Sequence, residues 1–155
     1  MHNVSHQINI LLDDSVIEPS SQVKFLGLIM DENLNFQAHI NSVCSKASSG
    51  LFALWRLSCY CNTDLLLTAY YGLVYPFLSY SVVIWGADSL RVKPIFVLQK
   101  KIIRLIFGLA NTESCRNAFR DNSILTFPSI YLLETLCYIK RNYSSFWSLF
   151  LLSCL

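Results

Sequence analysis

Residues 23–40, VKFLGLIMDENLNFQAHI, contain the point at which the sequence changes from a strand pattern to a helix pattern. The first half is rich in Val, Ile and Phe, which favour strands, and residues 31–33 supply turn chemistry. Gly27 interrupts the strand pattern and predicts a bulge or a close backbone approach. From Asn35, a plausible N-cap, apolar residues recur at steps of three and four. This stretch therefore predicts antiparallel β-structure followed by helices.

The region before this stretch contains two adjacent carboxylates, Asp13 and Asp14, directly after the apolar residues 7–12. A polymerase active site needs carboxylates that converge on two magnesium ions, and an aromatic-x pair precedes its Asp-Asp motif. Leu11 and Leu12 occupy those two positions here. Asp is also enriched in turns for its own hydrogen-bonding reasons. We therefore interpret Asp13 and Asp14 as a hairpin turn and expect no catalytic residue in this chain.

The rest of the chain predicts helices. Asn62 or Thr63 starts one that Pro76 breaks, and Pro94 and Gly108 bracket another, because proline suits a first turn and glycine a C-terminal cap. The expected class is α+β, mostly α: a small N-terminal antiparallel hairpin followed by a bundle of four or five helices. We divide the chain into a hairpin segment (1–34), a helical region (35–143) and an apolar tail (144–155). The expected helices are residues 35–58, 62–76 and beyond, 94–108, 113–121 and 129–142.

The composition is unusually apolar for a chain of one-domain size. Of the 155 residues, 54% are hydrophobic and only 14% are charged, against about 25% charged in typical soluble domains. Such a chain either lies partly in a bilayer or is a piece of a larger protein that covers its apolar faces. The formal net charge of +2 indicates that any basic patch must be local.

Residues 65–87 carry no formal charge and are long enough to span a bilayer. Pro76 at the centre argues against a span, and so do the tyrosines in the middle, because membrane aromatics gather at the two ends. A small helical membrane protein spanning residues 65–87 stays an alternative interpretation. The first apolar run is too short for a signal-peptide core, so we expect an intracellular protein of the cytoplasm or nucleus.

The cysteines and histidines indicate no metal site. The six cysteines include no Cys-x-x-Cys pair, and His2, His6 and His39 lie apart from most of them. A zinc site needs four clustered ligands, so free thiols in a reducing compartment are expected instead. We expect no cofactor in this chain.

The basic residues Lys100, Lys101 and Arg104 form a local cluster. Lys100 and Arg104 share one helix face at a spacing of four, and Lys101 stands beside it. Such a cluster can bind phosphates with salt-dependent affinity, or it can simply be the solvated flank of an amphipathic helix. Lys46 and Arg56, on the wet side of the first helix, are further candidates for nucleic-acid binding.

Several segments, in a fixed order over residues 8–143, together resemble one family. The stretch 23–40 and the four later segments are similar to the region that follows the palm in reverse transcriptases of non-LTR retrotransposons, the LINE or jockey-like elements. There, a Phe-Leu-Gly strand, an Asp-x-x-Leu turn and a His-Ile helix start precede a helical thumb or connection region. The later segments are SKASSGLFALWRL (45–57), LLLTAYYGLVYPFLSYSVVIWG (65–86), VLQKKIIRLIFG (97–108) and ILTFPSIYLLETLCYIKRN (124–142).

This resemblance implies a role in holding a template and primer. The strand Phe25-Leu26-Gly27 would lie against the primer terminus as a primer grip, and the helix with Lys100 would belong to a thumb that holds an RNA/DNA duplex. The fingers, the palm and the magnesium-binding aspartates of the full-length RNA-directed DNA polymerase would precede residue 1. We therefore expect weak, salt-sensitive binding to a template–primer duplex and to the missing palm and fingers, without polymerase activity. A decayed reading frame with no activity is the remaining alternative.

Overall fold

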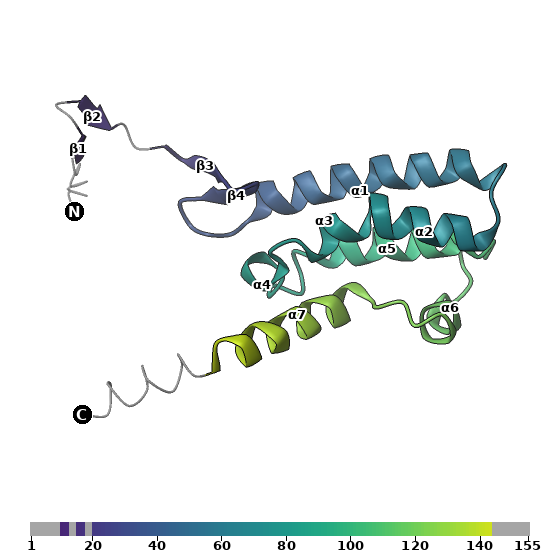
Figure 1. Ribbon diagram of the computed structural model, residues 1–155. Helices are drawn as coiled ribbons and strands as arrows, with labels where there is room; N and C mark the ends of the chain where they lie inside the picture. Colours follow the sequence, from purple (N-terminus) through teal and green to yellow (C-terminus); the bar gives the residue numbers. More distant parts are fainter. Residues whose placement is uncertain (1–9, 13–14, 18–19, 144–155) are drawn as a thin grey trace.

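Two β-hairpins precede the helices in the computed structural model (Figure 1). Strand β1 (Ile10–Leu12) pairs antiparallel with β2 (Ser15–Ile17). The expected N-terminal antiparallel structure is confirmed. Asp13, Asp14 and the tail 144–155 lie outside the described residues, so the turn and the tail stay predictions. The structure describes residues 10–12, 15–17 and 20–143.

The second hairpin joins β3 (Gln22–Phe25) to β4 (Leu28–Asp31) through a two-residue turn. Phe25 pairs with Leu28, and the two residues between them, Leu26 and Gly27, have φ angles of 46° and 85°. Positive φ at both central residues defines the tight hairpin turn whose twist matches that of the flanking strands. Of the two alternatives predicted for Gly27, the bulge is therefore wrong, and residues 25–27 do not form a continuous strand. The sequence pattern does not reveal this turn, because Gly27 is its only residue of a type that favours turns and the residues on both sides are apolar.

The mostly helical α+β class is confirmed, with seven helices in the described part of the chain instead of four or five. The difference arises in the uncharged run, where Pro76 in a first turn and Ser81 with φ of 51° divide one expected element into three. The helices are α1 (Gln37–Ser58), α2 (Thr63–Leu73), α3 (Tyr75–Ser79), α4 (Val82–Trp85), α5 (Lys93–Ile106), α6 (Arg116–Asp121) and α7 (Phe127–Arg141).

Local capping chemistry sets two of the helix ends as expected. The Asn62 side chain accepts a hydrogen bond from the Leu65 N–H and caps α2. After α5, Gly108 has φ of 63°, and the N–H of Leu109 donates to the carbonyl of Arg104 at 2.9 Å. A left-handed glycine followed by this six-residue bond is the common glycine-terminated helix end.

The start of α1 differs from the prediction. Phe36, not Asn35, is the N-cap, with φ of 55° and no side-chain capping bond. The Asn35 N–H instead donates to Asp31 Oδ1 at 2.9 Å, and Asn33 donates to the same oxygen at 3.1 Å. The predicted cap is wrong because the Asp31 carboxylate holds the turn, so the helix begins beyond Asn35.

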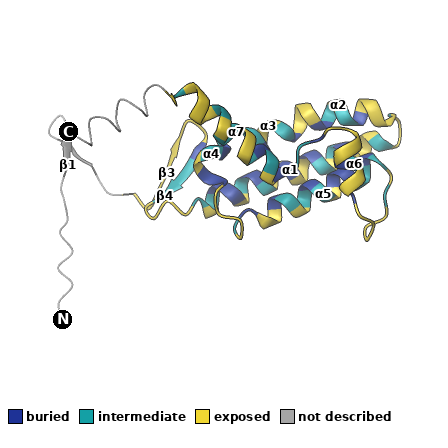
Figure 2. Cartoon of the chain, turned by 90° about the horizontal axis from the view of Figure 1, so that it is seen from below, coloured by how far each residue is buried: buried dark blue, intermediate teal, exposed yellow. Residues whose placement is uncertain are grey.

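The core lies between α1, α2, α5 and α7. Helix α1 packs along α5 and α2, and α7 packs against α3, α4 and α5 (Figure 1). The buried faces meet in the middle of this helical body, as Figure 2 shows. At one crossing, a Cβ added to Gly50 would lie 2.6 Å from Val74 Cγ2, so only glycine allows α1 and the α2–α3 junction to approach this closely. Within the described residues, no helix is both long and apolar enough to cross a membrane.

A buried polar network joins α2, α5 and α7. The side-chain amide of Gln99 donates to Tyr70 Oη and to the Leu125 carbonyl, each at 2.9 Å, and accepts from the Phe127 N–H at 2.7 Å. Gln99 is 1% exposed and Tyr70 is fully buried. Burial raises the pKa of Tyr70 to about 12, so its hydroxyl stays protonated at neutral pH. The network therefore fixes where α7 begins relative to α5.

Candidate nucleic-acid interface

Four cationic side chains surround one groove, called here the α5–α6 groove. Lys100 and Arg104 come from α5, and Arg116 and Arg120 come from α6, each pair at a spacing of four. The groove has a volume of about 620 Å³. Among the described residues, no Asp or Glu lines it. The arrangement therefore attracts anions with little local neutralisation.

The floor and one end of the groove are uncharged. Phe96, Phe119 and Ile124 supply apolar surface, and the hydroxyls of Thr126 and Ser129 lie at the end where α7 begins. These two hydroxyls are 2.8 Å apart, and Thr126 caps α7 through the Ser129 N–H. The groove thus combines hydroxyls, cations and an apolar floor.

Two of the cations are held in place without a carboxylate partner. Lys100 Nζ lies 4.5 Å from the centre of the Phe96 ring, a cation–π contact. Arg104 Nε donates to the backbone carbonyl of Glu113 at 2.9 Å. The Glu113 carboxylate accepts from the Ala110 N–H at 3.2 Å and so folds the α5–α6 connection back on itself. This fold-back sets α6 across from α5.

The opposite wall is more exposed. Arg120 Nε pairs with Asp121 Oδ1 at 3.0 Å, with side-chain exposures of 74% and 60%. Such a solvated pair holds its partners weakly, so the guanidinium can turn toward a phosphate. Sequence patterns did not single out Arg116 and Arg120 as candidates. Their spacing of four on an expected short helix was the available signal, but it did not show which element they would face.

Lys101 lies apart from the other two residues of its cluster. It lines a second groove with Lys93 on the flank of α5 that faces α1, where Cys44 and Ser48 lie opposite. The shared face predicted for Lys100 and Arg104 is present, and Lys101 extends beyond it. The three residues therefore present charge to two different surfaces.

Lys46 and Arg56 do not join the α5–α6 groove. Both are exposed on α1, as expected, but Lys46 Nζ lies 5.1 Å from the centre of the Phe77 ring on α3. Arg56 lies in the last turn of α1, where a cation complements the helix dipole. The structure therefore gives each of them a local role and does not bring the five candidate cations together.

The primer-grip-like residues form the tip of the β3–β4 hairpin. Phe25 and Leu26 are 59% and 73% exposed. The Tyr80 hydroxyl donates to the Leu26 carbonyl and so ties the turn to the region between α3 and α4. A Cβ on Gly27 would lie 3.7 Å from the Tyr80 ring. The tip thus presents apolar side chains outward, while Tyr80 holds its backbone through the Leu26 carbonyl.

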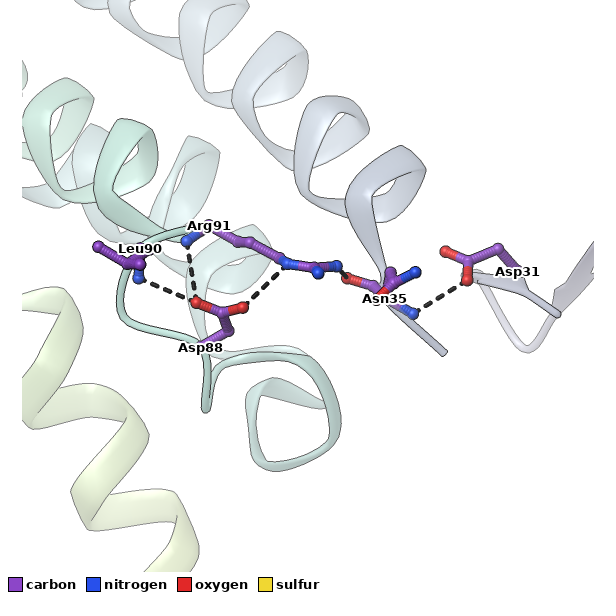
Figure 3. A network of polar contacts seen from close by, with 5 residues as sticks. All are labelled: Asp31, Asn35, Asp88, Leu90 and Arg91. Carbon is purple, nitrogen blue, oxygen red and sulfur yellow. Dashed lines mark hydrogen bonds and ion pairs between the residues drawn. The ribbon is translucent and has the colours of Figure 1, made fainter. Parts of the chain in front are cut away.

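A polar network holds this hairpin to the helical body (Figure 3). Arg91 donates from Nη1 to the Asn35 carbonyl at 3.0 Å and pairs through Nε with Asp88 Oδ2 at 2.9 Å. Asp88 also accepts from the backbone N–H groups of Leu90 and Arg91. The network joins the β4–α1 turn to the α4–α5 connection.

His39 lies beneath this junction. Its Nδ1 accepts from the Ile29 N–H at 3.4 Å, and its ring packs edge-on at 5.3 Å from the ring of Trp85. Because Nδ1 accepts, the neutral ring carries its proton on Nε2, which has no hydrogen-bond partner among the described residues. Burial lowers the pKa of His39, and the charge of Lys46 lowers it further. The residue is therefore held neutral.

The described residues do not point to a metal site, and comparison with known proteins does not point to a relative. Within the part of the chain that the structure describes, no group of three or more His, Cys, Asp or Glu side chains lies close enough to hold a metal ion. No family model, no curated protein and no solved structure matches the chain. The α5–α6 groove is therefore interpreted from its own chemistry.

Proposed function

We propose that this chain is the post-palm part of a non-LTR retrotransposon reverse transcriptase and that it binds the backbone of an RNA/DNA template–primer. The order of the family-like segments along residues 8–143 supports this origin. The observation that carries the binding function is the α5–α6 groove, where four cations face one space that no described carboxylate lines. A Lys or Arg side chain that contacts a phosphate releases counterions from the nucleic acid, and this release supplies much of the affinity for the backbone. A groove with several cations is therefore suited to backbone binding.

The proposal agrees with the modest charge of the whole chain. A net charge of +2 gives little long-range attraction, but a local groove with four cations creates a strong field over a short distance. Binding through phosphates reads the shape of a duplex and carries no base sequence information. We therefore expect low sequence specificity and a steep dependence on salt.

The β3–β4 hairpin has a separate part in this function. Phe25 and Leu26 present apolar side chains at a tip that Tyr80 holds in place. An apolar tip suits contact with sugars at a primer end or with the palm and fingers of the parent polymerase. These contacts position the nucleic acid, while the reaction itself would take place on the aspartates of the palm.

Fluorescence anisotropy with a blunt RNA/DNA hybrid at low salt tests the proposal. Replacing Lys100 and Arg104 with Gln should weaken binding and make the salt dependence shallower by about one unit per lost phosphate contact, about two in all. The logarithm of the association constant is measured against the logarithm of the salt concentration.

A matched control uses Lys140→Gln with Arg141→Gln. These residues lie in the last turn of α7, about 20 Å along the helix from its groove end, and their removal costs the same two charges. The control should keep the wild-type salt dependence. Equal losses in the two double variants would contradict the proposed site, and a folded wild-type chain that does not bind the hybrid would contradict the function.

A further inference from the structure

The α5–α6 groove has a shape that a double helix does not fill. Its volume of about 620 Å³ lies within the range of roughly 300–1,000 Å³ that is typical of sites for small ligands. A duplex presents its phosphates on a broad convex surface, so it contacts the cations at the rim and leaves the floor uncovered. The floor needs a different explanation.

The floor is apolar and includes aromatic surface. Phe96 is half-buried there, and Phe119 and Ile124 are largely buried, at 6% and 4% exposure. In a duplex the base faces are stacked on one another and cannot reach such a surface. An unpaired base has free faces, and proteins that bind single strands cover these faces with aromatic and apolar side chains.

The two walls are suited to a phosphate between them. On the α5 wall, Lys100 is held over Phe96, and Arg104 uses Nε for the Glu113 carbonyl. The hydrogen bond from the Arg104 side chain to this carbonyl uses Nε, so its Nη groups can donate to a phosphate. Arg116 and Arg120 approach from the α6 wall. A charged groove over an apolar floor is the combination that single-stranded nucleic acids require.

We infer that the α5–α6 groove binds one unpaired nucleotide of a single-stranded extension, with its phosphate between the two cationic walls and its base on the apolar floor. This inference rests on the proposed function, because it places the duplex beside the rim and the unpaired extension inside the groove. The chain thereby recognises the junction between paired and unpaired nucleic acid.

Three forms of one ligand test the inference with the full chain. The probes are the blunt hybrid, the same hybrid with a short 5′ RNA extension, and the same extension with abasic sugars. The natural extension should raise affinity roughly ten-fold over the blunt hybrid, a typical gain for one stacked base. The abasic extension keeps the added phosphates and should lose most of this gain.

A variant pair locates the effect. Arg116→Gln with Arg120→Gln should reduce the ratio of affinities for the extended and blunt hybrids, whereas Lys140→Gln with Arg141→Gln should leave the ratio unchanged. Both pairs are exposed, and circular dichroism checks that each variant is folded.

The outcomes separate this inference from the proposed function. Equal affinity for blunt and extended hybrids, or an equal gain from the abasic extension, overturns the inference and leaves duplex binding intact. An unchanged ratio in the α6-wall variant also overturns it. Binding of the extended hybrid without measurable binding of the blunt hybrid supports the nucleotide site and overturns the duplex function, and no binding of any probe overturns both.

Discussion

The helical body and the β3–β4 hairpin are held by different kinds of contact. The body has a continuous apolar core together with the buried Gln99 network, in which every polar group of the amide has a partner. All four residues of β3 are exposed. Leu28 and Met30 of β4 pack against the apolar core. The hairpin's other contacts with the body are those of Tyr80, His39 and the Arg91 network. Buried contacts should therefore determine global stability, and contacts at the hairpin should determine how a binding surface is presented.

The largest expected effect comes from Gln99 in the body. Gln99→Leu keeps a similar volume but leaves the Phe127 N–H and the Leu125 carbonyl without partners in a buried site. Each unsatisfied buried group costs about 1–3 kcal/mol, so we expect a loss of about 3 kcal/mol in the free energy of unfolding. Urea denaturation followed by circular dichroism measures it.

Tyr70→Phe is the matched control for Gln99→Leu. It removes one hydrogen-bond partner of Gln99 and leaves the two bonds that hold the start of α7. A loss of about 1 kcal/mol is expected. Equal losses in the two variants would show that the contact between α5 and α7 contributes less than the structure indicates.

The next effect depends on pH and lies at the base of the hairpin. His39 is neutral in the fold, and its pKa is lowered from 6.5, first by burial and then by Lys46. The unfolded chain therefore binds a proton more readily, and stability that is fully present above pH 6.5 is lost as the pH falls toward the folded-state pKa. Denaturation at several pH values should show a slope that His39→Gln reduces.

Lys46→Gln gives a second check on the pH dependence. Removing this positive charge takes away the smaller of the two causes, so the pKa of His39 should rise toward its ordinary value. The slope of stability against pH should become shallower than in the wild-type chain. If His39→Gln leaves the slope of stability against pH unchanged, groups other than His39 cause the pH dependence.

A smaller effect is expected at the rim of the same junction. Arg91→Ala removes the bond to the Asn35 carbonyl and the ion pair with Asp88, whose side chains are 36% and 46% exposed. A solvated ion pair contributes up to about 1 kcal/mol and the exposed hydrogen bond adds a similar small amount, so thermal denaturation should show a total loss of about 1 kcal/mol. The loss should shrink further at high salt, and a loss as large as that of Gln99→Leu would remove the distinction between body and hairpin.

The sequence predicted those parts of the fold that depend on neighbouring residues. Asn62, Pro94 and Gly108 bound helices as expected, because capping and proline effects act within one turn of the chain. Asn35 did not, because Asp31 and Arg91 bind its backbone groups. Arg91 lies 56 positions away in the chain, and sequence spacing does not show such a partner.

The candidate site was predicted in part for the same reason. The shared face of Lys100 and Arg104 follows from helix geometry alone. The opposite wall, with Arg116 and Arg120, depends on how Glu113 folds the connection back over α5, which is a property of the loop. Sequence patterns therefore identified one wall of the α5–α6 groove and not the other.

The smallest expected effect has the opposite sign and lies at the hairpin tip. Leu26 adopts φ of 46°, a region that is unfavourable for Leu and tolerated by Asn, and it is 73% exposed. Asn followed by Gly is a preferred pair for this type of turn. Leu26→Asn should therefore raise the free energy of unfolding by about 0.5 kcal/mol, because turn strain is relieved and little burial is lost.

The same variant tests why Leu occupies a position that disfavours it. If the apolar tip contacts a primer end or the missing palm, Leu26→Asn should weaken hybrid binding in the anisotropy assay although the fold becomes more stable. Gly27→Ala, at φ of 85°, is the control of opposite sign and should destabilise the hairpin while Leu26 keeps its side chain. Unchanged binding in a stabilised Leu26→Asn chain would remove the tip from the proposed interface and leave the α5–α6 groove as its only described part.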